Sequence, residues 1–311
     1  MRIQDISIII PVFNSEKTLA PLVDLLVEKL SDSGLLEIVL INDCSQDNSE
    51  QVCIGLFKKY PEKIRLFSLA KNVGEHNAVM AGLNQSNGEY AVIMDDDFQN
   101  PVSEVIKLIE FAVNNNYDAV HTYYPDKKHS WFRNIGSAFN DKIANIMLKK
   151  PSNLYLSSFK IMNRFLIDEI IKYDLPFAYI DGLILRTTSN IGQIQVEHDF
   201  RKGGKSGYTL KKLISLWLNM FTSFSVFPLR IAMFLGFVFS IVGFILGLVV
   251  LYWWYTGEKL PVGYSSQMVG ISMFSGIILI SIGMVGEYVG RMFLSQNKQP
   301  QYSIRRKFEK N

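Results

Sequence analysis

Two long uncharged runs constrain this chain most. Residues 231–255 (IAMFLGFVFSIVGFILGLVVLYWWY) contain no charged residue, and residues 264–286 contain none either. A helix needs roughly 20 consecutive apolar residues to cross the hydrocarbon core of a bilayer, and each run exceeds that length. The runs therefore predict two transmembrane helices, at about residues 231–255 and 265–290. The alternative is a helical hairpin buried in a protein core.

The charges beside these runs predict their orientation. Basic residues precede the first run and follow the second, whereas the connection TGEKLPVG between them is short and nearly neutral. Because cytoplasmic flanks carry an excess of lysine and arginine, we expect both termini and the large N-terminal region in the cytoplasm, with the chain in the inner membrane. The flanking basic residues are Lys211, Lys212, Arg230, Arg291, Lys298, Arg305, Arg306 and Lys307.

Composition adds little beyond this distribution. The chain has 311 residues, 48% of them hydrophobic, and a formal net charge of +3. This near balance gives no indication of a nucleic-acid partner. The apolar run near the N-terminus is too short for a signal peptide. Because a cytoplasmic location is expected, we expect no disulfide between Cys44 and Cys53.

Residues 1–208 show the alternation typical of an α/β domain. This alternation predicts a mainly parallel sheet whose ligand lies at the carboxyl ends of its strands. No G-x-G-x-x-G or Walker sequence is present, which disfavours an ordinary dinucleotide fold or a P-loop. The expected strands are 6–12, 37–41, 64–69, 90–94 and 118–123, and the expected helices include 19–30, 74–84 and 101–114.

Three further segments complete the predicted organisation. Residues 209–229 carry lysines at one end and apolar residues at mixed helical spacing, which favours an amphipathic helix in the membrane interface. An ordinary packed helix is the alternative for its first half. Residues 230–293 are the predicted two-helix hairpin, and residues 294–311 are a basic cytoplasmic tail.

Three consecutive carboxylates directly follow the apolar run YAVIM. They belong to Asp95, Asp96 and Asp97, and holding this charge at the tip of a buried strand requires a counter-charge. A divalent cation such as Mg²⁺ or Mn²⁺ takes oxygen ligands and shares them with a substrate phosphate. On an extended backbone Asp95 and Asp97 point the same way, while Asp96 faces the core edge or a backbone amide. Gln99 can add a carbonyl oxygen. A solvated Asp-rich turn is the alternative.

Four motifs in this order resemble the GT-A glycosyltransferases of family 2. They are PVFNSEKTL, INDCSQD, KNVGEHNAVMAGLNQSNGEY and MDDDFQNP. The polyprenyl-phosphate branch is the closer match, namely dolichyl-phosphate mannose synthase and the bacterial undecaprenyl-phosphate glycosyltransferases. The resemblance continues through SWFRNIGS, RKGGKSGYTLKKL, SFSVFPLR and MVGEYVGRMF, so it covers nearly the whole chain. It implies a GT-A Rossmann-like nucleotide-sugar domain.

The resemblance also implies roles at the donor. Family 2 enzymes invert the anomeric carbon, which implies a single in-line displacement. A metal, Mg²⁺ or Mn²⁺, would neutralise the charge that develops on the departing nucleoside diphosphate. The implied metal ligands are Asp95, Asp97 and Gln99. The implied nucleotide-binding residues are Pro11, Phe13, Glu16, Asp43, Lys71 and Asp96, with Asp43 accepting from a nucleobase N–H.

At the acceptor, cations matter more than a base. A phosphate monoester has a second pKa of about 6, so a polyprenyl phosphate is already mostly ionised at neutral pH. Arg133 and Ser137 match the family's acceptor-phosphate residues and lie four apart, on one helix face. Arg201, Lys202 and Lys205 match the family's basic loop before the interfacial helix. The catalytic group implied by the resemblance includes Arg133 and Lys205 beside the acidic cluster. Each basic residue taken alone could be a solvated surface charge.

Several departures from the family's pattern affect the details of phosphate binding rather than the reaction class. Relatives usually carry aspartate at Asn42 and Asn100, glycine at Cys44, and arginine at Tyr124. Asp181, in YIDG, is a candidate for donor sugar hydroxyls, and a buried structural aspartate is equally consistent with the sequence. Lys127 and Lys128 could substitute for the missing arginine, and Lys205 for the lysine absent from Ser206-Gly207-Tyr208.

These features predict an enzyme that moves a hexose from a nucleotide sugar, with a UDP-linked donor favoured, to undecaprenyl or another polyprenyl phosphate. The product would serve the modification of a cell-envelope glycan such as lipopolysaccharide. A processive polysaccharide synthase is an alternative, but its Q-x-x-R-W segment is absent, since no Arg-Trp dipeptide occurs. A non-catalytic membrane scaffold or lipid-carrier subunit is another alternative, which the intact Asp95, Asp97 and Gln99 disfavour. Paired membrane hairpins in relatives suggest a homo-oligomer.

Overall fold

The chain forms two compact units in the computed structural model. The first consists of Met1–Thr209 and Lys298–Asn311, and the second of Leu210–Asn297. The structure describes residues 5–30, 35–124, 154–176, 178–197, 227–256, 263–297 and 300–310.

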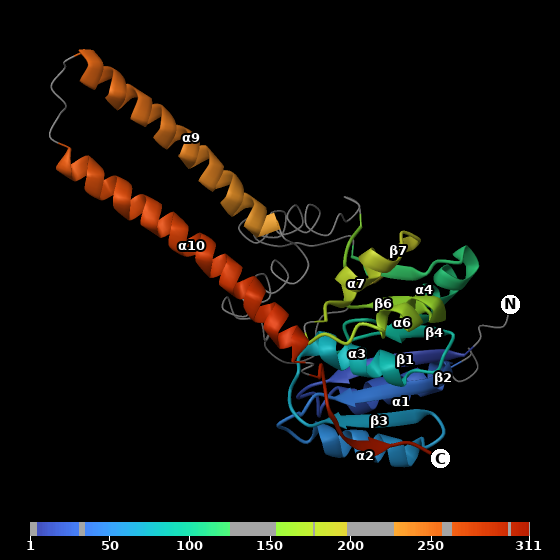
Figure 1. Cartoon of the computed structure of the whole chain (residues 1–311). Coiled ribbons are helices and arrows are strands. Elements are labelled where there is room, and N and C mark those ends of the chain that lie inside the picture. The colour runs from blue at the N-terminus through green and yellow to red at the C-terminus, as the bar shows by residue number, and fades with distance from the viewer. Residues whose placement is uncertain are drawn as a thin grey trace. The chain divides into compact units, whose positions relative to one another are not determined.

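An eight-stranded sheet forms the centre of the first unit, in the order β7-β5-β6-β4-β1-β2-β3-β8 (Figure 1). The pairs β1–β2, β1–β4, β2–β3 and β5–β7 are parallel, whereas β6 and β8 run antiparallel to their neighbours. The predicted mainly parallel sheet is therefore confirmed. The strands are β1 Ile6–Val12, β2 Leu35–Asn42, β3 Ile64–Leu69, β4 Tyr90–Ile93, β5 Ala119–Tyr123, β6 Lys160–Asn163, β7 Ile191–Gln195 and β8 Ile304–Phe308.

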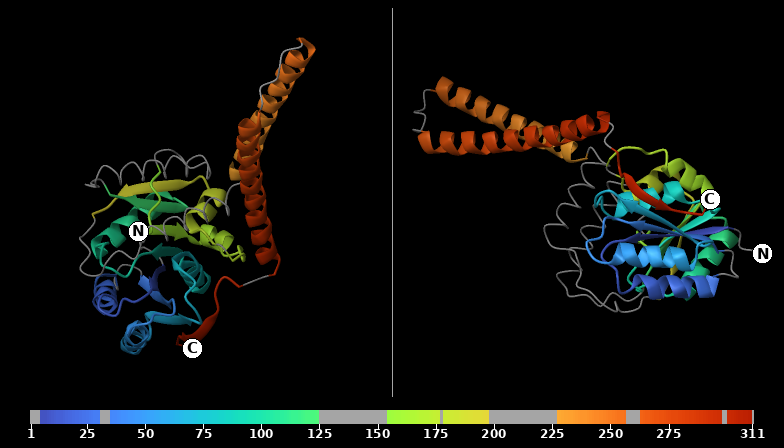
Figure 2. Two further views of the ribbon diagram at one scale, coloured as in Figure 1. Left: turned by 90° about the vertical axis from the view of Figure 1, so that its left-hand side faces the viewer. Right: turned by 90° about the horizontal axis from the view of Figure 1, so that it is seen from below.

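Helices cover both faces of this sheet. α1 contacts α2 and α4 on one face, and α3 and α6 contact α7 on the other (Figure 2). The predicted strands and helices are all present, with ends shifted by at most a few residues, while β6, β7 and β8 are not among those predicted. The helices are α1 Leu19–Leu30, α2 Ser49–Lys59, α3 Glu75–Gln85, α4 Val102–Asn115, α6 Arg164–Ile170 and α7 Ile180–Thr187.

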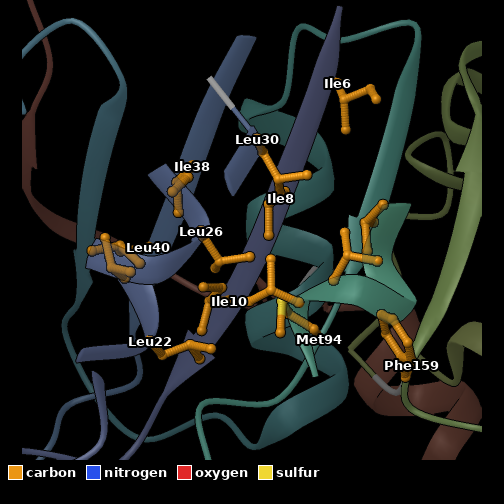
Figure 3. Packing of buried hydrophobic residues seen from close by; sticks show 14 of the residues in the cluster. Ile6, Ile8, Ile10, Leu22, Leu26, Leu30, Ile38, Leu40, Met94 and Phe159 are labelled. Carbon is orange, nitrogen blue, oxygen red and sulfur yellow. The ribbon is translucent and has the colours of Figure 1, made fainter. Parts of the chain in front are cut away.

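The strand β1 is apolar on both faces because helices bury both. Ile9 faces α3, where Gly82 allows a close approach: a Cβ added at Gly82 would lie 2.3 Å from the Ile9 Cγ2 atom. On the opposite face, alternate residues of β1 pack with the leucines that recur every four residues along α1. Figure 3 shows this packing through Ile8, Ile10, Leu22 and Leu26.

The order of the parallel strands locates a ligand crevice. The chain passes from β1 to β2 and β3 on one side, and then places β4 on the other side of β1. Connections therefore leave the carboxyl ends of β1 and β4 in opposite directions. In open α/β sheets this switch point is where ligands bind. The acidic cluster follows β4 directly, so the fold brings it to this position.

The second unit contains α9 (Phe227–Thr256) and α10 (Tyr264–Gln296), which include the two uncharged runs. The helices contact each other, and the rings of Phe239 and Phe274 meet edge to face with centroids 6.0 Å apart. Many large apolar side chains are exposed, among them Phe234, Phe244, Leu279 and Phe293. Within the described ranges, no helix combines the length and apolarity that a membrane crossing requires. The two predicted spans therefore stay a prediction.

The C-terminal segment returns to the first unit after α10. β8 pairs antiparallel with β3 along that edge of the sheet, and the Ala70 amide donates to the Ser303 carbonyl oxygen at 2.8 Å. Gln301 is buried and donates to the carbonyl oxygens of Tyr173 and Leu175. The predicted basic tail thus includes a structural strand of the N-terminal domain.

Candidate active site at the carboxyl edge of the sheet

The loops after β1 and β2 are joined by hydrogen bonds at this edge. The Asn14 amide donates to the Ser45 hydroxyl at 3.2 Å, and the Gln46 amide donates to Asn14 Oδ1 at 2.8 Å. The Ser15 amide donates to Ser49 Oγ at 2.7 Å. The two loops therefore form one cross-linked surface beside the switch point.

The loops after β1, β2, β3 and β4 each contain a residue with positive φ. These are Asn14 (57°), Cys44 (55°), Gly74 (83°) and Phe98 (63°), which follow β1, β2, β3 and β4. A bulky residue such as Phe98 rarely adopts this conformation. Strained backbone of this kind persists where the surrounding structure imposes it, and it is concentrated at functional sites.

Asp96 turns away from its two acidic neighbours. Its Oδ2 atom accepts from the Phe13 amide at 3.4 Å, which is the kind of backbone contact expected for it. Burial, together with the neighbouring charge of Asp95, raises the pKa of Asp96 to about 6, against hydrogen bonds from Ser15 and Phe13. Asp96 therefore links the loop after β4 to the loop after β1.

Asp95 and Asp97 are held by different groups. Asp95 Oδ2 accepts from the Ser158 hydroxyl at 2.7 Å, and Asp97 Oδ1 accepts from the Gln99 amide at 3.1 Å. The strand β4 ends at Ile93, so these residues lie in a turn rather than on an extended backbone. The turn, and not the alternation of a strand, separates Asp96 from the other two carboxylates.

The chemistry of this donor set suits a hard divalent cation. Asp95, Asp97 and Gln99 offer only oxygen atoms, from two carboxylates and one amide, on half-buried residues of one turn. Among the described residues, no group of three or more His, Cys, Asp or Glu side chains could hold a metal ion. A cation here would therefore complete its coordination with phosphate oxygens and water, as magnesium usually does in nucleotide sites.

Both carboxylate oxygens of Asp43 accept hydrogen bonds from backbone amides. Its Oδ1 and Oδ2 atoms accept from the amides of Val73 and Gly74 at 2.8 and 3.0 Å, and the residue is only 3% exposed. Burial raises the pKa of Asp43, against these two hydrogen bonds, which lower it. Asp43 thereby fixes the turn that begins α3. Its expected contact with a nucleobase remains a prediction.

The other residues expected at the nucleotide lie around the same edge. Phe13 has 45% of its surface exposed, and Lys71 is also exposed. Pro11 is half-buried within β1. Glu16 Oε2 accepts from the amide and side chain of Asn48, at 3.2 and 3.1 Å, so it also supports the loop after β2.

Two residues at the start of α3 belong to this edge and received no predicted role. Glu75 is exposed, yet partial removal of water by the surrounding protein, together with the charge of Asp95, raises its pKa to about 7. Burial lowers the pKa of His76 to about 4, and its ring meets Tyr179 edge to face with centroids 5.1 Å apart. The sequence feature that could have pointed to them is their place in KNVGEH, a motif at the carboxyl edge of the sheet.

Asp181 forms a buried ion pair with Lys160. Asp181 lies in the first turn of α7 and Lys160 begins β6; they are 8% and 4% exposed. Burial alone would raise the pKa of Asp181, but Lys160, together with His121 and His76, holds it below its ordinary value. This pairing is what the structural alternative for Asp181 predicts, while the donor-sugar role remains a prediction.

Two of the departures from the family pattern contact each other. The Tyr124 hydroxyl donates to Asn100 Oδ1 at 2.8 Å, and Asn100 is 3% exposed. Burial raises the pKa of Tyr124 to about 12, so the hydroxyl stays protonated at neutral pH. A neutral hydrogen-bonded pair therefore stands where arginine and aspartate are usual.

The residues predicted to bind the acceptor phosphate lie outside the described ranges. The same holds for the two lysines proposed to replace the missing arginine, and for most of the predicted interfacial segment 209–229. The residues concerned are Arg133, Ser137, Arg201, Lys202, Lys205, Lys127 and Lys128.

An α/β sheet with its acidic loop at the β1–β4 switch point agrees with the GT-A fold of nucleotide-sugar transferases. Residues 7–171 match the family model described as "Glycosyl transferase family 2". Because the match spans more than half of the chain, the chain belongs to glycosyltransferase family 2.

Similar proteins extend this match over the full chain. The chain is 29% identical to an undecaprenyl-phosphate 4-deoxy-4-formamido-L-arabinose transferase of Proteus mirabilis, over 98% of this chain and 94% of the relative. A relative of the same name from Pectobacterium atrosepticum is 28% identical over the same shares. Among solved structures, the UDP complex of glucosyl-3-phosphoglycerate synthase from Mycobacterium tuberculosis aligns with a TM-score of 0.51 at 17% identity, covering 70% of this chain and 79% of that one. This last likeness supports the fold.

Proposed function

We propose that this chain transfers a sugar from a UDP-linked donor to undecaprenyl phosphate or a related polyprenyl phosphate. The proposed use of a nucleotide-sugar donor rests on one observation, the position of Asp95 and Asp97 at the switch point of a family 2 domain. Similarity over 98% of the chain to proteins named undecaprenyl-phosphate sugar transferases supports the proposed acceptor.

At the donor, Asp95, Asp97 and Gln99 would hold Mg²⁺ or Mn²⁺. The cation would supply Lewis-acid stabilisation to the departing diphosphate. Support comes from the oxygen-only donor set and from a structure of similar fold, a glucosyl-3-phosphoglycerate synthase whose name includes Mn²⁺ and UDP-glucose. The hydrogen bonds from the Ser158 hydroxyl and the Gln99 amide keep these carboxylates in place before the donor arrives, which lowers the cost of ordering the site.

The nucleotide would lie against the loops after β1, β2 and β3. The exposed ring of Phe13 offers an apolar surface to a base, and the exposed ammonium of Lys71 offers a charge to the diphosphate. Pro11, Glu16 and Asp43 would shape this surface. Asp96 would support this surface indirectly, because it accepts a hydrogen bond from the Phe13 amide.

At the acceptor, the chemistry requires positive charge more than a base. A polyprenyl phosphate that is already ionised can attack the anomeric carbon directly, with inversion. The resemblance assigns its binding to Arg133, Ser137, Arg201, Lys202 and Lys205. We keep the donor-sugar role of Asp181 as part of the proposal, together with its structural alternative.

The second unit and the tail support a proposed membrane location. We propose that α9 and α10 carry the two spans, because they contain the uncharged runs and expose many large apolar side chains. β8 follows α10 yet pairs within the sheet of the N-terminal domain. The two ends of a membrane hairpin would therefore emerge on the same side, and the flanking basic residues favour the cytoplasmic side of the inner membrane.

A donor screen tests this function. The purified full-length protein in detergent is given undecaprenyl phosphate, Mn²⁺ or Mg²⁺, and radiolabelled UDP-sugars, including the UDP derivative of 4-deoxy-4-formamido-L-arabinose. We expect one donor to give a labelled lipid. Lipid binding without transfer from any donor would instead support the scaffold alternative.

A further inference from the structure

The segment before β6 carries a serine at the acidic cluster. Ser158 Oγ donates to Asp95 Oδ2 at 2.7 Å. This separation is the usual one for a hydrogen bond donated by a hydroxyl group. Ser158 is thus in direct contact with a proposed metal ligand, although it belongs to a segment about sixty residues further along the chain.

The strand register explains this meeting. β6 runs antiparallel to β4, with Lys160 opposite Ile93. Two positions before Lys160 and two positions after Ile93 are Ser158 and Asp95, so continuing the same register sets them opposite each other. The contact follows from the pairing of the two strands.

Buried neighbours hold both partners. Met94 precedes Asp95 and Phe159 follows Ser158; both are fully buried in the core cluster, and both are labelled in Figure 3. Side chains in a packed core occupy few conformations. The backbone on each side of the hydrogen bond is therefore fixed by the core.

The preceding residue, Ser157, anchors the segment to β5. Its hydroxyl lies 2.9 Å from Thr122 Oγ1 and accepts from the Phe159 amide at 3.1 Å. Thr122 Oγ1 also donates to the Phe159 carbonyl oxygen at 2.8 Å. Three strands of the sheet, β4, β5 and β6, thus determine where the Ser158 hydroxyl lies.

We propose that Ser158 is a positioning residue that orients the Asp95 carboxylate for metal binding. This inference rests on the proposed function, because it assumes a divalent cation at Asp95 and Asp97. Hydrogen-bond partners behind metal ligands fix ligand orientation, and their loss typically costs 10–100-fold in metal affinity. The hydroxyl is neutral, so it orients the carboxylate without cancelling the charge that attracts the cation.

The test measures Mn²⁺ binding itself. Full-length protein in detergent, with saturating UDP, is titrated with Mn²⁺, and unbound Mn²⁺ is measured by its electron paramagnetic resonance signal. We expect Ser158→Ala to weaken Mn²⁺ binding about 10–100-fold, whereas Ser158→Thr, which keeps a hydroxyl, stays within about threefold of the parent. UDP binding in EDTA and the KM for the lipid should not change.

Ser86→Ala is the matched control. Ser86 is a serine whose hydroxyl likewise donates to the protein, to the Leu83 carbonyl oxygen at 2.9 Å, but it lies beyond α3, away from the acidic cluster. We expect this variant to bind Mn²⁺ like the parent.

Unchanged Mn²⁺ affinity in Ser158→Ala would overturn the proposal, and so would an equal loss in Ser158→Thr. If Ser158→Ala fails to fold, the comparison of Ser158→Thr with the parent still decides the matter, because loss of affinity in a folded Thr variant contradicts the role of the hydroxyl. A parent protein that binds UDP but no Mn²⁺ would refute the metal assignment itself, which is a separate result.

Discussion

Carboxylates at the two ends of the central strands have different kinds of partner. Near their amino ends, Glu37 is buried and pairs with Arg65 at 3.0 Å, while its other oxygen accepts from Ser7 and from the Asn87 amide. At the carboxyl ends, the hydroxyl and backbone amides that hold Asp95, Asp96 and Asp97 are neutral. The guanidinium of arginine neutralises the charge of a carboxylate. A neutral donor orients the carboxylate and leaves its charge in place.

This difference separates a structural network from a binding site. A buried carboxylate that is paired with arginine is satisfied within the fold, and removing its partner is strongly destabilising. Carboxylates that are oriented and crowded together keep a strong attraction for an added cation. The following predictions test that distinction, from the largest expected effect to the smallest.

Asp97→Asn should have the largest effect, and on catalysis. We expect metal-dependent transfer to fall by about 10³-fold or more, because Lewis-acid stabilisation of a leaving group contributes several kcal/mol. Thermal unfolding of the metal-free protein should change little, since the hydrogen bond that Asp97 accepts from the Gln99 amide is local. Initial rates with a productive donor give the first value and calorimetry gives the second. Full activity in this variant would remove Asp97 from the metal site.

Glu37→Gln should show the opposite behaviour. We expect a loss of about 2 kcal/mol in the free energy of unfolding, because Arg65 loses the buried one of its two carboxylate partners and keeps only the more exposed Glu309. Turnover per folded molecule should be retained. The measurement is thermal unfolding together with activity corrected for the folded fraction.

Glu62→Gln provides the matched control for Glu37→Gln. Glu62 pairs with Lys310 on the surface, where both side chains are more than half exposed. We expect a change below about 1 kcal/mol, as for other exposed ion pairs. Equal losses in the two variants would contradict the assignment of Glu37 to a buried structural network.

Asp96→Asn should alter the dependence of stability on pH. Asp96 has a pKa of about 6 in the folded protein against an ordinary value of 3.8. The unfolded chain therefore releases its proton first as the pH rises from about 4 to 6, which weakens the native protein. We expect the variant to match the parent at pH 4 and to be more stable by about 1 kcal/mol at pH 8, after allowance for partial solvent exposure. Unfolding of the metal-free proteins at both pH values measures this, and a gain only at pH 4 would refute it.

Tyr124→Phe should have the smallest effect. Removing the hydroxyl leaves Asn100 Oδ1 without that donor in a buried position, at a cost of about 1 kcal/mol. Mn²⁺ affinity in the presence of UDP should change by less than about threefold, because the pair lies behind the acidic turn. Chemical denaturation measures the stability change, and an unchanged midpoint would show that the hydrogen bond contributes nothing measurable.

The strength of local patterns explains how much the sequence could predict. The strands 6–12 and 64–69 and the helix 19–30 are long and strongly apolar on their buried faces, and all three predicted ranges agree with the structure. In contrast, β6 has four residues and β8 reads IRRKF, with only its end residues apolar. Both form because a neighbouring strand already offers an edge, which no local pattern records.

The residues of the candidate site likewise fall into those that a local pattern predicts and those that it does not. Asp95, Asp97 and Gln99 were visible because they are close together in the sequence and follow an apolar run. Ser158 and the ion pair of Lys160 with Asp181 depend on the antiparallel pairing of β6 with β4, which brings distant segments together. Contacts between segments far apart in the sequence cannot be read from the spacing of either segment.

The most direct test of the central claim is the linkage between metal and nucleotide at the carboxyl edge. UDP is titrated calorimetrically into the full-length protein in detergent, once with saturating Mn²⁺ and once with EDTA. If the oriented carboxylates hold a cation that the diphosphate shares, UDP should bind at least about tenfold more tightly with Mn²⁺. Equal affinity for UDP in both titrations would contradict a metal-bearing donor site at Asp95 and Asp97.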